Sequence, residues 1–220
     1  MTIDNDDLLN SIIASLNRID PVALEELPNI DLYMDQLTSF MDDRLKKTTR
    51  HPDTDKILTK TMINNYAKND LLPPPVKKKY SKDHLILLIY IYYLKNVLSI
   101  NDIQTLLEPL KERFGLKDDY NLSNIYETCY ELQLEALEPV IEDIKKKYAR
   151  SLETAIDDRI TEEEQKKMQL FSFVALLSYD VYVKKLLVEK ILDNVTEDEA
   201  RKKALQKTDK DKKNRTKDKN

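Results

Sequence analysis

The chain has 220 residues and a mass of 25.9 kDa, enough for two small units with a sizeable core. Glycine occurs once, at Gly115, which argues against kinases, P-loop proteins, Rossmann enzymes and tight primed hairpins. Hydrophobic residues make up 41% of the chain and charged residues 35%, a balance typical of amphipathic helices. We therefore expect an all-α protein.

Cysteine and histidine are too scarce for the usual metal or disulfide chemistry. Cys129 is the only cysteine, and His51 and His84 are the only histidines. This excludes a disulfide framework and a cysteine/histidine zinc site, and it predicts a reducing, cytoplasmic setting. No acid/base residues are grouped with histidine or cysteine, so we expect no enzyme activity, no metal and no cofactor.

Nothing in the sequence predicts export or a membrane span. The first ten residues are acidic, whereas a secretory signal begins with basic residues. The most apolar stretches, residues 85–94 and 170–177, are far shorter than the roughly twenty residues that cross a bilayer. We expect a soluble protein without a membrane partner.

Charge is strongly segregated along the chain. Residues 1–43 carry a net charge of −9, residues 44–82 carry +8, and residues 201–220 carry +7, although the whole chain carries only −4. Basic zones of this kind attract phosphate backbones, because each lysine or arginine that neutralises a phosphate releases condensed counterions. Charge runs are also common on plain solvated surfaces, so charge alone does not identify a nucleic-acid partner.

In the first half of the chain, helical spacing alternates with clear breaks. Residues 6–19 have the spacing of an amphipathic helix, and a second helix is predicted after Asp31 as its N-cap. Thr59 is the predicted N-cap of a third helix, residues 60–70. Three prolines at 73–75 and three lysines then predict a short exposed wing.

The second half is predicted to be almost entirely helical. Ser81 begins an apolar helix through Leu98, and residues 99–102 have the Ser-x-x-Asp form of a capping box before the next helix. Residues 122–148 and 152–160 are amphipathic, and residues 168–195 are apolar on most sides. Residues 201–220 have almost no hydrophobic side chains, which predicts disorder.

The order of features in residues 59–110 resembles the DNA-binding domain of MerR-type regulators. The residues that carry this likeness are Ile63-Asn64-Asn65-Tyr66-Ala67-Lys68-Asn69-Asp70-Leu71-Leu72, Pro73-Pro74-Pro75, Lys77-Lys78-Lys79-Tyr80-Ser81 and Ser99-Ile100-Asn101-Asp102-Ile103. In that family a recognition helix ends in a tyrosine-rich turn and Leu-Leu-Pro, and a basic wing and two further helices follow. The chain also resembles a largely Firmicutes family of unknown function that shares this region.

The chain departs from the MerR pattern at several positions. About 55 residues precede the expected recognition helix, and the usual glycine before Leu-Leu is Asp70. Asn64 and Asn65 stand where the family commonly has an arginine and a tyrosine. Base readout and phosphate contacts are therefore expected to differ from those of the family.

Periodicity, composition and this resemblance together predict four segments. Residues 1–28 form an N-terminal amphipathic helix, and residues 29–114 form a MerR-like winged helix-turn-helix domain. Residues 115–195 form a C-terminal helical region for dimerisation or effector binding, and residues 196–220 form a disordered basic tail. We expect residues 121–195 to form an isologous homodimer. The helix over residues 168–195 is apolar on most sides, and packing against a single neighbouring helix leaves part of its apolar surface exposed to water. The alternative is that residues 122–148 and the first helix cover it within one chain.

Candidate DNA contacts follow from side-chain chemistry. Asparagine bonds adenine through two groups in the major groove, so the predicted base contacts are Lys60, Asn64 and Asn65. The predicted phosphate contacts are Arg44, Tyr66, Lys68, Lys77, Lys78, Lys79 and Tyr80. For the two tyrosines, core packing with the hydroxyl at the rim is an equally good interpretation.

The sequence therefore predicts a sequence-specific regulator of bacterial type that binds double-stranded DNA. The alternative is a helical protein–protein adaptor that keeps the fold without base readout. The sequence identifies no small-molecule effector.

Overall fold

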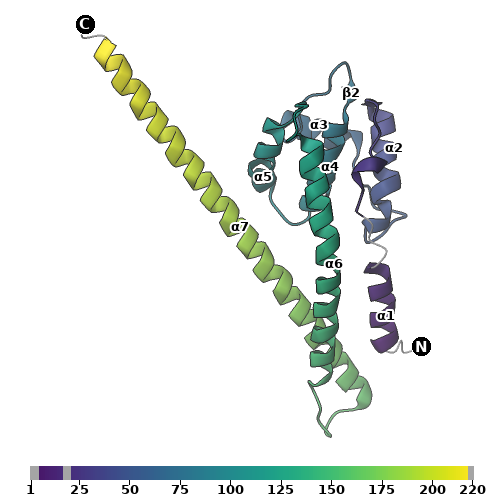
Figure 1. The fold of residues 1–220 in the computed structure, drawn as a ribbon. Coiled ribbons are helices and arrows are strands. Elements are labelled where there is room, and N and C mark those ends of the chain that lie inside the picture. Colours follow the sequence, from purple (N-terminus) through teal and green to yellow (C-terminus); the bar gives the residue numbers. More distant parts are fainter. Residues whose placement is uncertain (1–4, 17–20, 218–220) are drawn as a thin grey trace.

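The computed structural model describes residues 5–16 and 21–217, and most of these residues are helical (Figure 1). The helices in this part of the chain are α1 (Asn5–Leu16), α2 (Met34–Leu45), α3 (Lys60–Lys68), α4 (Lys82–Leu94), α5 (Ile100–Glu112), α6 (Leu122–Leu152) and α7 (Glu162–Lys217). Two short 3₁₀ turns, η1 (Leu24–Glu26) and η2 (Lys46–Thr48), flank α2.

A small sheet modifies the all-α expectation. Strands β1 (Leu32–Tyr33) and β2 (Lys79–Tyr80) pair antiparallel, with Leu32 opposite Tyr80 and Tyr33 opposite Lys79. Because β1 occupies these residues, the N-cap of α2 is Tyr33 and not the predicted Asp31. Two residues per strand are too few to give a periodic pattern, so the sheet has no signature in the sequence.

Most predicted helix starts are confirmed. Thr59 accepts a hydrogen bond from the backbone N–H of Met62, at 3.2 Å. Ser99 and Asp102 form the predicted capping box, and Ser81 is the N-cap of α4. These caps are recognisable in the sequence because donor and acceptor lie three residues apart.

Helix α4 is the centre of the main core. Its side chains from His84 to Ile89 are all buried, and residues of α2, α3, α5 and α6 belong to the same cluster. Tyr126 of α6 donates a 2.6 Å hydrogen bond to the carbonyl oxygen of Val22, which joins α6 to the segment before η1. A helix apolar on most sides is stable in water only when neighbours cover it, and here four helices do.

Helices α6 and α7 extend beyond this core, and α1 lies beside them (Figure 1). Leu9, Tyr148 and Phe173, from these three helices, form a second buried cluster. The predicted helix over residues 152–160 is wrong: α6 ends at Leu152, and residues 153–161 connect it to α7 with Ala155 at a φ of 57°. The charged and turn-forming residues Asp157 and Asp158 favour a connection here.

The basic C-terminal segment also differs from the sequence-based expectation. Helix α7 continues to Lys217, where disorder was predicted from residue 196. Residues 196–217 contain no glycine or proline, and their most frequent residue is lysine, which favours helix. Within this stretch Arg201 pairs with Glu197 one turn earlier, at 3.4 Å.

Candidate nucleic-acid interface

Helix α3 has one buried face and one exposed polar face. Ile63 points into the main core and is fully buried. The opposite face carries Lys60, Asn64, Asn65 and Lys68, all of which are exposed. The three predicted base contacts therefore lie together on one short helix, with their side chains in solvent.

An unusual backbone turn ends α3. Asp70 has a φ of 57°, in the left-handed region where glycine is usual. The backbone N–H groups of Leu71 and Leu72 donate to the carbonyl oxygen of Tyr66, at 2.9 and 3.3 Å. This closure turns the chain sharply, so that Leu71 and Leu72 return to the core immediately after the exposed helix.

A lysine of α5 fixes this turn. The ammonium group of Lys111 donates to the carbonyl oxygen of Asp70 at 2.8 Å and to its carboxylate at 3.3 Å. Partial burial lowers the pKa of Lys111, but hydrogen bonds to Glu108 and Asp70 outweigh this effect and leave the pKa raised. Sequence reasoning missed Lys111, although an aspartate in place of the expected glycine was a signal that something must stabilise this turn.

The predicted wing is a tight hairpin. Val76 and Lys79 exchange both backbone hydrogen bonds, at 3.0 and 3.1 Å, across the two-residue turn Lys77-Lys78. Both turn residues have positive φ, 50° and 64°, as in a type I′ turn. This corrects the expectation that a chain with one glycine has no primed hairpin. Two lysines adopt the strained backbone, and both are exposed.

The base of the hairpin is held by aromatic and cationic contacts. The Lys79 ammonium lies 5.1 Å from the centre of the Tyr33 ring on the paired strand. Tyr80 is only 3% exposed and its ring meets His84 edge-on, with 5.3 Å between the ring centres. This placement is the core-packing alternative for Tyr80, and we leave Tyr80 out of the candidate interface.

His84 is buried beneath the hairpin. Its Nδ1 accepts a 2.9 Å hydrogen bond from the backbone N–H of Ser81, and its ring packs edge-on against Phe114, with centres 4.7 Å apart. Burial lowers the pKa of His84, and the nearby carboxylates of Asp83 and Asp31 oppose that shift. A neutral imidazole therefore links the end of the hairpin to the start of α4.

Ion pairs within the fold reduce the charge of the basic segment. Arg44 pairs with Glu26 at 2.5 Å, and Lys60 pairs with Asp35 of α2. In the described part of the chain, no acidic partner lies against Lys68, Lys77 or Lys78. Lys68, Lys77 and Lys78 therefore place cationic charge without an acidic partner at the end of α3 and at the hairpin tip.

The fold brings these two features to one end of the molecule. Figure 1 shows α3 and the segment that leads into β2 at the same end of the core, opposite to α1. Tyr66 is half-buried on α3, and burial raises the pKa of its hydroxyl. Arg44 lies in the last turn of α2 and forms an ion pair with Glu26, so its charge is partly neutralised within the fold.

Other site types find little support in the described residues. Their histidine, cysteine, aspartate and glutamate side chains include no cluster suited to a metal ion. Within the same residues, no helix is both long and apolar enough to span a bilayer.

Comparison with known proteins assigns a domain to this region. No curated protein and no solved structure matches the chain significantly. Residues 22–129 match a protein family described as "Domain of unknown function (DUF1836)". The match includes α2 to α5, the hairpin and the first turns of α6, and therefore contains the whole candidate interface. Residues 22–129 of this chain are a DUF1836 domain.

Proposed function

We propose that this domain binds double-stranded DNA and acts as a sequence-specific transcription regulator of bacterial type, without enzymatic activity. The observation that carries the proposal is the pairing of one exposed polar helix, α3, with an exposed dilysine hairpin at the same end of the core. Each feature supplies one half of what DNA recognition needs, base readout and phosphate contact.

Helix α3 has the side chains for base readout. Asn64 and Asn65 are adjacent and exposed. In the major groove the NH2 group of an asparagine amide donates to adenine N7, and its carbonyl oxygen accepts from the adenine N6 amino group. Lys60 lies one turn earlier, where its ammonium can exchange its contact with Asp35 for guanine O6 or N7. A helix of nine residues is long enough to enter the groove by its exposed face.

The hairpin has the properties of a phosphate clamp. Lys77 and Lys78 lie at a tip whose backbone is fixed by two hydrogen bonds. Because the backbone is already ordered, binding loses little conformational entropy there. Their strained backbone favours a functional reason for lysine, because asparagine and glycine fit this turn better. Lys68 adds a third unpaired cation near the end of α3.

We also propose that the protein acts as a homodimer. Between Met168 and Val195, about 42 Å of α7 carries apolar side chains that the rest of the chain leaves exposed. They are Met168, Leu170, Phe171, Val174, Leu176, Tyr179, Val181, Tyr182, Val183, Leu186, Leu187, Val188, Ile191 and Val195. Within the chain, Phe173 is buried against α1 and α6 near one end of this surface and Leu192 in the main core near the other, whereas the side chains named above stay exposed. A second copy covers such a patch and presents two α3 helices to paired half-sites.

Binding measurements with matched variants test the DNA proposal. Duplexes selected from a random pool are titrated at several salt concentrations, with unselected duplex as the reference. Replacing Lys77 and Lys78 with alanine is expected to weaken binding to both and to lower the salt slope by about 0.9 per lost phosphate contact. The matched control replaces Lys145 and Lys146, two adjacent exposed lysines of α6, and leaves the slope unchanged.

Replacing either asparagine should affect binding to the selected duplex only, unlike the lysine replacement, which should affect both duplexes. Asn64→Ala or Asn65→Ala is expected to cost about 1–3 kcal/mol on the selected duplex and almost nothing on the unselected one. Equal losses on both duplexes contradict base readout. If no duplex is bound even at low salt, the domain is a protein–protein adaptor and the DNA proposal is wrong.

Light scattering tests the dimer. A mass near twice 25.9 kDa at micromolar concentration is expected for the full chain. Phe171→Lys and Val181→Lys place charge on the exposed surface of α7 and are expected to give the single-chain mass. A single-chain mass for the unmodified protein refutes the dimer.

A further inference from the structure

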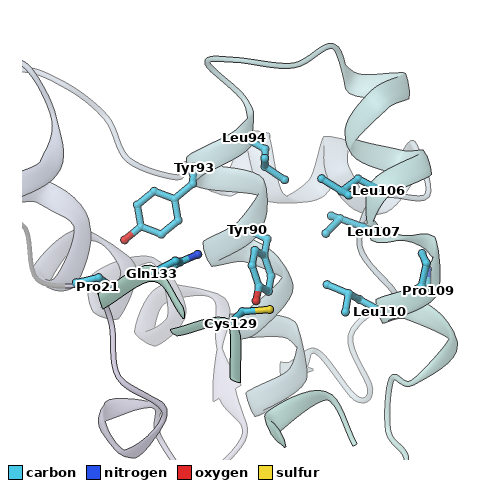
Figure 2. A pocket seen from close by; sticks show the side chains of 10 residues that line it. All are labelled: Pro21, Tyr90, Tyr93, Leu94, Leu106, Leu107, Pro109, Leu110, Cys129 and Gln133. Atoms are coloured by element: carbon cyan, nitrogen blue, oxygen red, sulfur yellow. The ribbon is translucent and has the colours of Figure 1, made fainter. Parts of the chain in front are cut away.

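A cavity of about 540 Å³ lies between α4, α5 and α6, outside the candidate DNA interface. Figure 2 shows its ten lining residues, with the leucines of α5 on one side and Tyr93 and Gln133 on the other. The chemistry of its walls is set by Leu106, Leu107, Leu110, Tyr90, Cys129 and Gln133. Its volume falls within the range of about 300–1,000 Å³ that small-molecule sites occupy.

The chemistry of the lining restricts what it can bind. None of the ten lining residues carries a formal charge, so a charged ligand loses hydration there without an ionic partner. The Tyr90 hydroxyl lies next to the Cys129 thiol (Figure 2), and burial, followed by interaction with that thiol, raises the pKa of Tyr90. The Tyr90 hydroxyl is therefore neutral at physiological pH, and together with Cys129 it forms an aromatic, weakly polar wall.

One exposed polar side chain lines the cavity. Gln133 is exposed, and its side-chain amide offers one donor group and one acceptor. The leucines opposite offer only apolar contact. A molecule with an apolar body and one hydrogen-bonding group at its edge satisfies both sides of the cavity.

We propose that this cavity is a binding site for a small, uncharged, mainly aromatic or branched hydrocarbon molecule whose one polar group faces Gln133. Burying its apolar surface supplies the binding free energy, at about 25 cal/mol per Å² removed from water. Three helices bound the space, and its volume suits a compact molecule better than a helix of a partner protein.

The site has a short physical connection to α3. Leu110 lines the cavity, and the next residue, Lys111, bonds the Asp70 turn that ends α3. A ligand that shifts the end of α5 therefore changes the contact that positions the end of α3. This regulatory consequence rests on the proposed DNA-binding function, whereas the site itself does not.

The sole cysteine gives a direct assay on the unmodified protein. N-phenyl-1-naphthylamine, a neutral aromatic amine that fluoresces in apolar surroundings, is the probe. We expect saturable binding, and at ten times the dissociation constant about a tenth of the protein remains free. Alkylation of Cys129 by iodoacetamide should then slow about tenfold. Probe bound to the exposed face of α7 leaves that rate unchanged.

A pair of variants localises the probe. Leu106→Trp fills the cavity from a side chain that is 40% exposed, so the fold has room to accept it. It is expected to weaken probe binding at least tenfold. Leu132→Trp, at an exposed leucine of α6 outside the cavity, is the matched control and should bind as the parent does.

Three outcomes overturn the proposal. The first is an unchanged alkylation rate of Cys129 at saturating probe. The second is equal probe affinity in the Leu106→Trp variant and the parent. The third is protection of Cys129 that depends on protein concentration and not on probe, which assigns the cavity to a second copy of the chain. None of these measurements involves DNA, so a failure here is separate from a failure of the proposed function.

Discussion

Replacing Lys77-Lys78 with Asn-Gly should stabilise the protein while weakening its binding to DNA. Both lysines have positive φ, and the left-handed region costs an L-residue roughly 1–2 kcal/mol. Asparagine and glycine adopt this turn more easily. Glycine also raises the conformational entropy of the unfolded chain, which lowers the gain in stability by about 0.4–1 kcal/mol. The net gain expected for the double variant is about 1–2 kcal/mol.

Thermal and urea unfolding measure this gain. For a chain of this size, each kcal/mol raises the melting temperature by about 2–4 °C, so the expected increase is about 2–8 °C. The urea midpoint should rise without a change in the m-value. Loss of two cations should also lower the DNA salt slope by about 1.8.

A charge-only control separates the two effects. The double variant Lys77→Gln/Lys78→Gln removes both charges but keeps two residues for which a positive φ is unfavourable. This control should lose DNA affinity as the Asn-Gly variant does, with no gain in stability. If the Asn-Gly variant is no more stable than the parent, the turn is not strained and the reasoning fails. Unchanged DNA binding in both variants removes the hairpin from the interface.

Three further predictions concern contacts within the fold. Because burial lowers the pKa of His84, the unfolded state takes up the proton first, and stability should fall as pH decreases through about 6.5. Urea unfolding at pH 7.5 and 5.5 should show a smaller difference for His84→Gln than for the parent. Tyr126→Phe leaves the buried carbonyl of Val22 without its 2.6 Å partner and should cost about 1–3 kcal/mol in the same assay. Lys111→Met removes the contacts to Asp70 and should cost about 1–2 kcal/mol, with faster amide hydrogen exchange at the end of α3 as a local readout.

Local sequence signals determined much of the helical framework. The caps at Thr59, Ser81 and Ser99 were predictable because their hydrogen bonds join residues three apart. The apolar run in α4 predicted a buried helix, since no other environment stabilises so many apolar side chains in water. The exposed lysines of the wing followed from three prolines that interrupt the helix before them.

The tertiary structure decided the features that join distant residues. Pairing of Tyr33 with Lys79 creates the sheet. The hydrogen bond from Lys111 to Asp70 stabilises a turn whose positive φ is unfavourable for aspartate. The cavity depends on the packing of α4, α5 and α6, and no single segment encodes its shape. Periodicity shows which face of a helix is apolar, but which side chains meet across the fold depends on the packing of whole helices, to which residues far apart in the chain contribute together.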